Sequence, residues 1–397
     1  MCVPRPRRDV QYIPIQYKGQ PYVMVQDRLG LVKEGILLPP NLYGVLLLLD
    51  RCTSIEEVQV TLTRQQGGLL VSKEEVLSLI EYMDRLNLLD TERLEKEKKR
   101  LVEEFSSLSM RPFVFGDRAY PSDRGSLSRF VEEILSESPP SPFDSPPKAV
   151  IAPHIDIGVG RKGYAASYSA LKGLSYENVV ILGIGHGLSE GVYCVSTKDF
   201  DTPFGLVENH GDATSYLLEM GSSVVSPNDF EHKFEHSIEF QLVFLKYLLG
   251  DFKLVPILCG SLGYFLPEYR RDIFLERCGP FLDALSEVVS WDNTLVVAGV
   301  DFSHIGPKFG HERDVYALKE EASSHDRSLL DALCERDMDE MWRISAQVED
   351  RYNVCGFSAL ATLGEVVGYT YMRVLHYEMS VEPPTSSGVG FASAVLF

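Results

Sequence analysis

Residues 294–306 read Thr-Leu-Val-Val-Ala-Gly-Val-Asp-Phe-Ser-His-Ile-Gly, and this stretch decides the fold class. Residues 294–300 are almost all apolar and rich in valine, and the run is too short for an ordinary helix. It therefore predicts a strand buried on both faces, as in an α/β sheet. The run ends in Asp301 and His304. Ligands bind at the carboxyl ends of strands in open α/β sheets, so a carboxylate and an imidazole there are placed for chemistry.

The same pattern repeats through the second part of the chain. From Lys148 onward, apolar runs alternate with helical stretches, which predicts a sheet covered by helices on both faces. The last two apolar runs are separated only by a Pro/Ser/Gly loop, so we expect an antiparallel pair at the end of the sheet. The predicted strands are 149–152, 179–184, 254–258, 295–300, 373–379 and 391–397, and the clearest helices are 164–171 and 237–249.

The first 105 residues have a different character. Two strand-like pieces, 12–17 and 21–25, precede three short helical segments. Ser72 and Glu75 have the spacing of a capping box in front of an amphipathic helix. We predict a small winged-helix-like α+β domain at residues 1–105 and an α/β domain at 106–397. The first domain lacks a basic recognition face, which favours a packing or dimerisation role over DNA binding.

Composition excludes several classes of protein. A chain of 397 residues exceeds what one hydrophobic core usually supports, in keeping with two domains. The net charge of −19, without a Lys/Arg stripe, argues against nucleic acid as a partner. No apolar run approaches the roughly 20 residues that a membrane span needs. The seven cysteines are scattered without a Cys-x-x-Cys pair, which favours reduced thiols and a cytoplasmic location.

Histidines gather where the predicted strands end. His154 follows the first run, His186 the second, and His304 the fourth, while His236 and Cys355 each lie where a helix starts. A helix N-terminus favours thiolate over thiol. Two histidines and a cysteine form a known zinc set and also suit copper, whereas two histidines and a carboxylate suit iron(II). The alternative is a group of hydrogen-bonded core histidines with an inert buried cysteine.

Residues 158–163 match the Gly-x-Gly-x-x-Gly pattern of dinucleotide-binding turns. The next predicted strand ends in Gly185-His186, without an acidic residue to hold a ribose. We therefore assign these glycines to close packing or to flexible entry into the cleft.

Five short motifs occur in the second part of the chain: Ala152-Pro153-His154, Ile181-Leu182-Gly183 with His186, Glu235-His236-Ser237-Ile238-Glu239, Asp301-Phe302-Ser303-His304 and Cys355-Gly356. Together they resemble the Memo family, in its prokaryotic branch called AmmeMemoRadiSam system protein B. The resemblance covers about residues 110–397 and implies a fold similar to that of the class III extradiol ring-cleaving dioxygenases, which use non-haem iron(II). It further implies a metal held by His154, His186 and Cys355, with His236, Asp301 and His304 around it.

The chain departs from the family pattern at two places. Pro-His-Ala-Gly-Tyr, common in relatives, is replaced by Pro153-His154-Ile155-Asp156-Ile157, and an arginine after Cys-Gly is replaced by Phe357. These changes leave the implied metal ligands intact.

Three functions remain open at this point. The first is an iron(II)- or copper-dependent redox enzyme for an unknown small substrate, with His304 or His236 as general base and Asp301 setting the tautomer of a neighbouring imidazole. The second is a non-catalytic module that binds a partner protein of the AmmeMemoRadiSam system. The third is zinc-assisted hydrolysis with Glu235 or Asp301 as base.

Overall fold

The computed structural model describes the whole chain apart from residues 1–2, 34, 66, 139–142, 144 and 263–268. Part of the Ser/Pro-rich tract 136–147 therefore lies outside the described residues. The chain divides into two compact units, Met1–Glu104 and Phe105–Phe397. None of the helices in the described part of the chain combines the length and the apolar character that crossing a bilayer demands.

The first unit is a small α+β assembly around its own apolar core. Strands β2 and β3 pair antiparallel, and β4 extends this sheet, while β1 pairs with β5. The predicted capping box is confirmed, because the Ser72 hydroxyl accepts from the Glu75 amide and the Ser72 amide donates to the Glu75 carboxylate. The winged-helix assignment stays a prediction. The elements are β1 (Arg5–Pro6), β2 (Val10–Tyr17), β3 (Gln20–Asp27), β4 (Leu37–Leu38), α1 (Pro40–Arg51), α2 (Ile55–Gln65), α3 (Lys73–Arg85) and β5 (Leu89–Asp90), followed by α4 (Glu92–Ser106).

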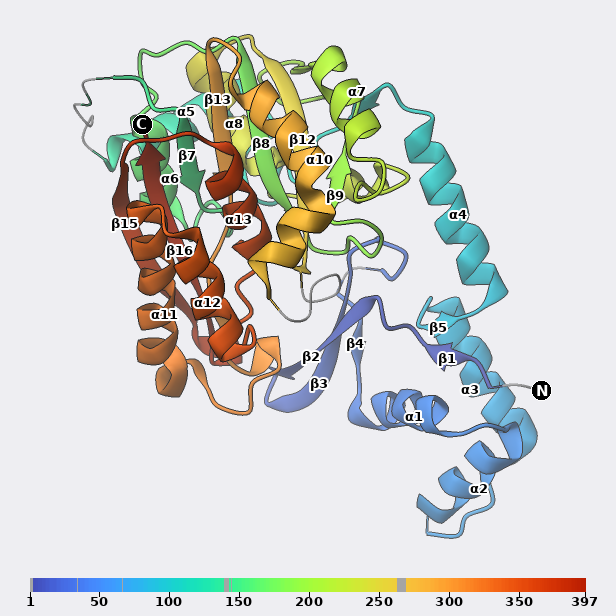
Figure 1. The fold of residues 1–397 in the computed structure, drawn as a ribbon. Helices are drawn as coiled ribbons and strands as arrows, with labels where there is room; N and C mark the ends of the chain where they lie inside the picture. Colours follow the sequence, from blue (N-terminus) through green and yellow to red (C-terminus); the bar gives the residue numbers. More distant parts are fainter. Residues whose placement is uncertain (1–2, 34, 66, 139–142, 144, 263–268) are drawn as a thin grey trace. The chain divides into compact units, whose positions relative to one another are not determined.

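The second unit is built on a mixed sheet with the strand order β11-β12-β8-β13-β7-β16-β14 (Figure 1). The strands from β11 to β7 run parallel, whereas β16 is antiparallel to β7, β14 and β15, and β9 is antiparallel to β12. The predicted α/β class and the final antiparallel pair are both confirmed. The strands are β7 (Ala149–Ala152), β8 (Asn178–Gly185), β9 (Tyr193–Val195), β11 (Glu208–Asn209), β12 (Lys253–Gly260), β13 (Thr294–Gly299), β14 (His304–Ile305), β15 (Met372–Glu382) and β16 (Ser387–Leu396).

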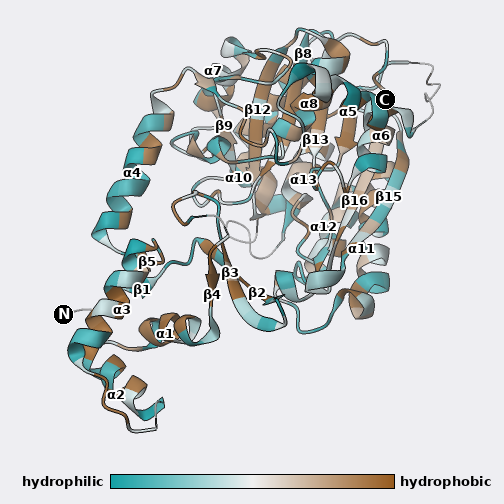
Figure 2. Cartoon of the chain, turned by 180° about the vertical axis from the view of Figure 1, so that it is seen from behind, coloured by the Kyte–Doolittle hydropathy of each residue, from teal (hydrophilic) through white to brown (hydrophobic). Residues whose placement is uncertain are grey.

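Helices cover both faces of this sheet. Successive residues of a strand point to opposite faces, so each central strand contributes side chains to two cores. Ala149 and Ile151 of β7 pack into one core, and Val150 and Ala152 pack into the other. The central strands are accordingly hydrophobic along their length (Figure 2). Helices α7 (Gly211–Met220), α10 (Arg271–Val289), α11 (Val315–Glu335), α12 (Met338–Val348) and α13 (Phe357–Val366) cover the first face, and α5 (Arg124–Ser136), α6 (Arg161–Ser169) and α8 (Glu239–Leu249) cover the second.

The glycines of residues 158–163 serve packing at the start of α6. A Cβ at Gly160 would lie 2.7 Å from the Ile155 side chain, and one at Gly163 would lie 3.0 Å from Pro153. These approaches fit the packing role predicted for the pattern.

Candidate metal centre

The site lies at the carboxyl ends of three neighbouring parallel strands, β7, β13 and β8. His154 follows β7, His186 directly follows β8, and Asp301 follows β13. Parallel strands in register end at the same edge of a sheet, so residues up to 147 positions apart meet there. Each strand is a buried apolar run, which fixes its position and hence the position of the side chain that follows it.

Cys355 reaches this edge from the segment that precedes α13. Gly356 makes the approach feasible, because a Cβ there would lie 2.5 Å from the carbonyl oxygen of Asp301. The Gly356 amide donates to that same carbonyl at 3.0 Å. The Cys355 Sγ consequently lies 3.6 Å from His154 Nε2.

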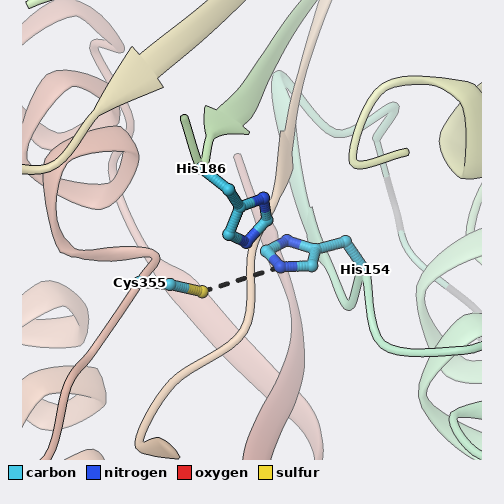
Figure 3. Close-up of side chains that lie close together, drawn as sticks. All are labelled: His154, His186 and Cys355. Atoms are coloured by element: carbon cyan, nitrogen blue, oxygen red, sulfur yellow. Dashed lines mark hydrogen bonds between the residues drawn. The ribbon is translucent and has the colours of Figure 1, made fainter. Parts of the chain in front are cut away.

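His154, His186 and Cys355 point toward one another (Figure 3), and one ligand atom from each lies within 4.8 Å of the others. The Sγ–Nε2 distance of 3.6 Å between Cys355 and His154 can be compared with ligand geometry. An ion bound tetrahedrally by nitrogen at about 2.1 Å and sulfur at about 2.3 Å separates those two atoms by about 3.6 Å. The three residues therefore have the donor chemistry for a single ion, and the pair of Cys355 and His154 has the spacing that one requires.

Two of the imidazoles are oriented by main-chain carbonyls. His154 Nδ1 lies 2.9 Å from the carbonyl oxygen of Gly299, and His304 Nδ1 lies 2.9 Å from that of Phe302. A carbonyl oxygen can only accept, so Nδ1 carries the proton in both rings. Each ring thus presents an unprotonated Nε2, the form that binds a metal or accepts a proton.

Two further imidazoles share the carboxylate of Glu235. Its Oε2 lies 2.9 Å from His186 Nδ1, and its Oε1 lies 3.1 Å from His236 Nδ1. Oε1 also accepts from the amides of His236 at 2.8 Å and Ser237 at 3.1 Å. His186, Glu235 and His236 form a second group with metal-ligand spacing. Because both carboxylate oxygens already accept from the protein, we assign Glu235 to orienting the two rings.

The site has a buried floor and an open side. The side chain of His154 is only 2% exposed, whereas His186 and His236 are 32% and 31% exposed. The rings of His186 and His236 stack with their centroids 5.3 Å apart, and His236 lies 5.3 Å from His154. A small molecule from solvent can therefore approach along the side of His186 and His236.

Burial dominates the protonation of the site. It lowers the pKa of His154 to about 4 and raises the pKa of Cys355 well above its ordinary value, with the charge of Asp301 adding to the second effect. Burial alone would also raise the pKa of Glu235, but His186 and His236 hold it well below its usual range. The raised pKa of Cys355 opposes the effect of the helix start, which favours the thiolate, because desolvation of the buried thiol is the largest contribution to its pKa. A bound divalent cation favours the thiolate again.

The remaining predicted residues take different positions. Asp301 accepts from the main-chain amide of His154 at 3.0 Å, while its other oxygen lies 3.6 Å from His154 Nε2. The Gly299 carbonyl, not Asp301, sets the tautomer of His154. His304 starts the short strand β14, and its ring packs edge-on at 4.9 Å against Phe309. Asp156 is exposed and accepts from the Gly158 amide of its own loop.

Sequence reasoning missed the orienting role of Glu235, which it considered only as a base for hydrolysis. The signal was present, since Glu235 directly precedes His236. Its second partner, His186, is 49 residues away, and only the fold brings the two together.

Comparisons with known proteins show the family to which this chain is similar. The family model described as Memo-like protein matches residues 111–395. A MEMO1 family protein of Aquifex aeolicus is 28% identical over 391 residues, covering 98% of this chain and 99% of the relative, so that the alignment includes the first unit. A MEMO1 family protein of Thermus thermophilus is 27% identical over 345 residues, covering 86% of this chain and 99% of the relative. A third MEMO1 family protein, from Nitrosopumilus maritimus, is 28% identical over 255 residues, and the alignment covers 62% of this chain and 82% of the relative.

Proposed function

The chain belongs to the Memo family, and from that premise we propose that it is a metal-dependent redox enzyme acting on a small substrate. His154, His186 and Cys355 would hold the ion. Iron(II) is the first choice because of the resemblance to the iron(II)-dependent ring-cleaving dioxygenases, and copper or zinc are the alternatives that two histidines and a cysteine suit. The observation that carries the proposal is the convergence of these three side chains at the strand ends, beside an open side lined by His186 and His236.

The ion would supply a positively charged site at which oxygen and substrate meet. The protein supplies the orientation of every group around it. Glu235 holds the rings of His186 and His236, and the Gly299 carbonyl holds the ring of His154. Asp301 holds the main chain of His154 in place.

His236 is the best-placed general base of the proposed reaction. Its Nδ1 faces the Glu235 carboxylate, so Nε2 lies on the opposite edge of the ring. Its ring lies 5.3 Å from that of the buried His154 and is 31% exposed, so it could take a proton from a substrate bound at the ion. His304 also presents Nε2 and is the second choice, because burial lowers its pKa and so weakens it as a base.

Zinc-assisted hydrolysis has less support. It needs a carboxylate that activates water, and Glu235 is already engaged by two imidazoles and three main-chain amides. Asp301 is 2% exposed and bonded to the His154 amide. A non-catalytic role in binding a partner protein would use the same residues without turnover. A substrate panel assayed with and without oxygen separates the three functions.

Metal analysis of the protein purified without oxygen tests the ligand set. We expect about one ion per chain in the wild type, and its loss in His154→Ala and in Cys355→Ser. His376→Ala and Cys334→Ser are matched controls, because both residues lie outside the site in β15 and α11. Full metal retention in both site variants would overturn the assignment.

A further inference from the structure

A buried arginine far from the ligands in sequence is tied to the segment that carries Glu235. Arg111 ends the short strand β6 (Met110–Arg111) and is 1% exposed. Its Nε donates to the carbonyl oxygen of His232 at 2.9 Å, and one terminal nitrogen donates to that of Glu235 at 2.8 Å. The other terminal nitrogen pairs with the carboxylate of Glu239. The guanidinium therefore clamps the main chain at both ends of residues 232–235.

Glu239 connects this clamp to the loop after β6. It lies in the first turn of α8 and is 2% exposed. Its carboxylate accepts from the amide of Phe115 at 2.8 Å and from the hydroxyl of Tyr120 at 2.5 Å. It also accepts from the Val114 amide at 3.1 Å. A buried carboxylate with this many donors is fully satisfied and holds one geometry.

The clamp has two connections to the imidazoles. The first runs through Glu235, whose carbonyl is held by Arg111 and whose carboxylate contacts His186 and His236. The second runs through Phe115, whose amide is held by Glu239 and whose ring lies edge-on at 5.7 Å from His236. A shift of Arg111 or Glu239 would thus reach His236 along both connections and His186 along the first.

We propose that Arg111 and Glu239 are positioning residues of the metal centre, which set the orientation of His186 and His236 by fixing the main chain of Glu235 and the ring of Phe115. The expected effect of Arg111 and Glu239 on metal binding rests on the proposed function. Their expected effect on the orientation of the two rings does not depend on any ion. The competing view is that the pair only stabilises the fold.

Arg111→Lys tests the proposal, since it keeps the charge but cannot donate to three acceptors in a fork. Arg7→Lys is the matched control, because Arg7 and Asp27 form a buried ion pair with fully buried side chains in the first unit. Nitrogen NMR of the metal-free protein reports the tautomers of His186 and His236. Titration with cobalt(II) alone reports the affinity of the centre, and its thiolate absorption reports Cys355. Thermal unfolding reports stability.

We expect both variants to lower the unfolding temperature, but only Arg111→Lys to disturb the Nδ1–H tautomers and to weaken cobalt binding by about tenfold to a hundredfold. Tyr120→Phe removes one hydrogen bond to Glu239 and should show the same effects more weakly, which covers the case of an Arg111 variant that does not fold. Unchanged tautomers and a cobalt affinity within twofold of wild type in a folded Arg111→Lys or Tyr120→Phe would overturn the inference. Failure of the wild type to bind cobalt would instead count against the proposed function, and the tautomer measurement would still decide the role of the pair.

Discussion

The Nδ1 atom of His186 lies 2.9 Å from Oε2 of Glu235, and the same carboxylate lies 3.1 Å from Nδ1 of His236. One buried acid therefore orients two imidazoles that come from different parts of the sequence. This sharing makes Glu235 the residue whose change should affect the centre most without removing a ligand.

Glu235→Gln should weaken metal binding by about tenfold to a hundredfold, because an amide keeps the shape but loses the charge that holds both Nδ1–H groups. Cobalt(II) titration measures the effect. Glu132→Gln is the control, since Glu132 is exposed and bonds Tyr247 away from the centre. Equal cobalt affinities in wild type and Glu235→Gln would contradict the orienting role.

His236→Gln and His304→Gln should both retain the ion, because neither residue belongs to the ligand set of His154, His186 and Cys355. Once a substrate is found, His236→Gln should lower kcat by about 100-fold or more if the ring is the general base. Metal content and kcat are measured on the same preparations. Loss of the ion from His236→Gln would make this residue a ligand instead.

Asp326→Asn should destabilise the protein by about 1–3 kcal/mol. Asp326 is fully buried on α11, accepts from the Ser303 amide at 3.2 Å and from the Tyr377 hydroxyl at 2.8 Å, and so anchors the segment between Asp301 and His304. Urea unfolding measures the change, with the exposed Asp331→Asn on the same helix as control. An unfolding free energy equal to that of the control would show that the contacts of the Asp326 carboxylate contribute nothing to the stability of the protein.

Stability should fall as the pH is lowered from about 6.5 toward 4, in part through His232. This ring is fully buried, its Nε2 bonds the carbonyl oxygen of Cys194 at 3.0 Å, and burial lowers its pKa to about 4. The unfolded chain binds the proton at higher pH than the folded one, so acid favours unfolding, by about 3 kcal/mol for the full shift.

Urea unfolding at several pH values compares wild type with His232→Gln, which keeps a donor for the Cys194 carbonyl. The variant should lose less stability between pH 6.5 and 4.5. Identical pH dependence in the two proteins would show that His232 is not buried in its neutral form.

The sequence predicted the parts of the fold and site that depend on local patterns. The runs at β7, β8 and β13 are short, apolar and rich in valine or isoleucine, so their burial could be predicted. The histidine or carboxylate after each run indicated the edge of the sheet where the site lies. The cysteine was found through the family resemblance and its place at a helix start.

The connections between distant residues could not be predicted in the same way. Arg111 and Glu239 are 128 residues apart, and nothing in either local stretch indicates that they share a buried ion pair. The thiol of Cys355 was assigned a thiolate from its place at a helix start, while its protonation depends on how deeply the whole fold buries it. Desolvation is a property of the packed structure.

Every imidazole of the centre has its Nδ1 turned to an acceptor of the protein itself, a carbonyl for His154 and His304 and a carboxylate for His186 and His236. The rings have thus given up their rotational freedom during folding, before any ion arrives. Capture of an ion by these rings would then need little further loss of side-chain entropy. Exchange of one metal for another should accordingly proceed without unfolding of the surrounding chain.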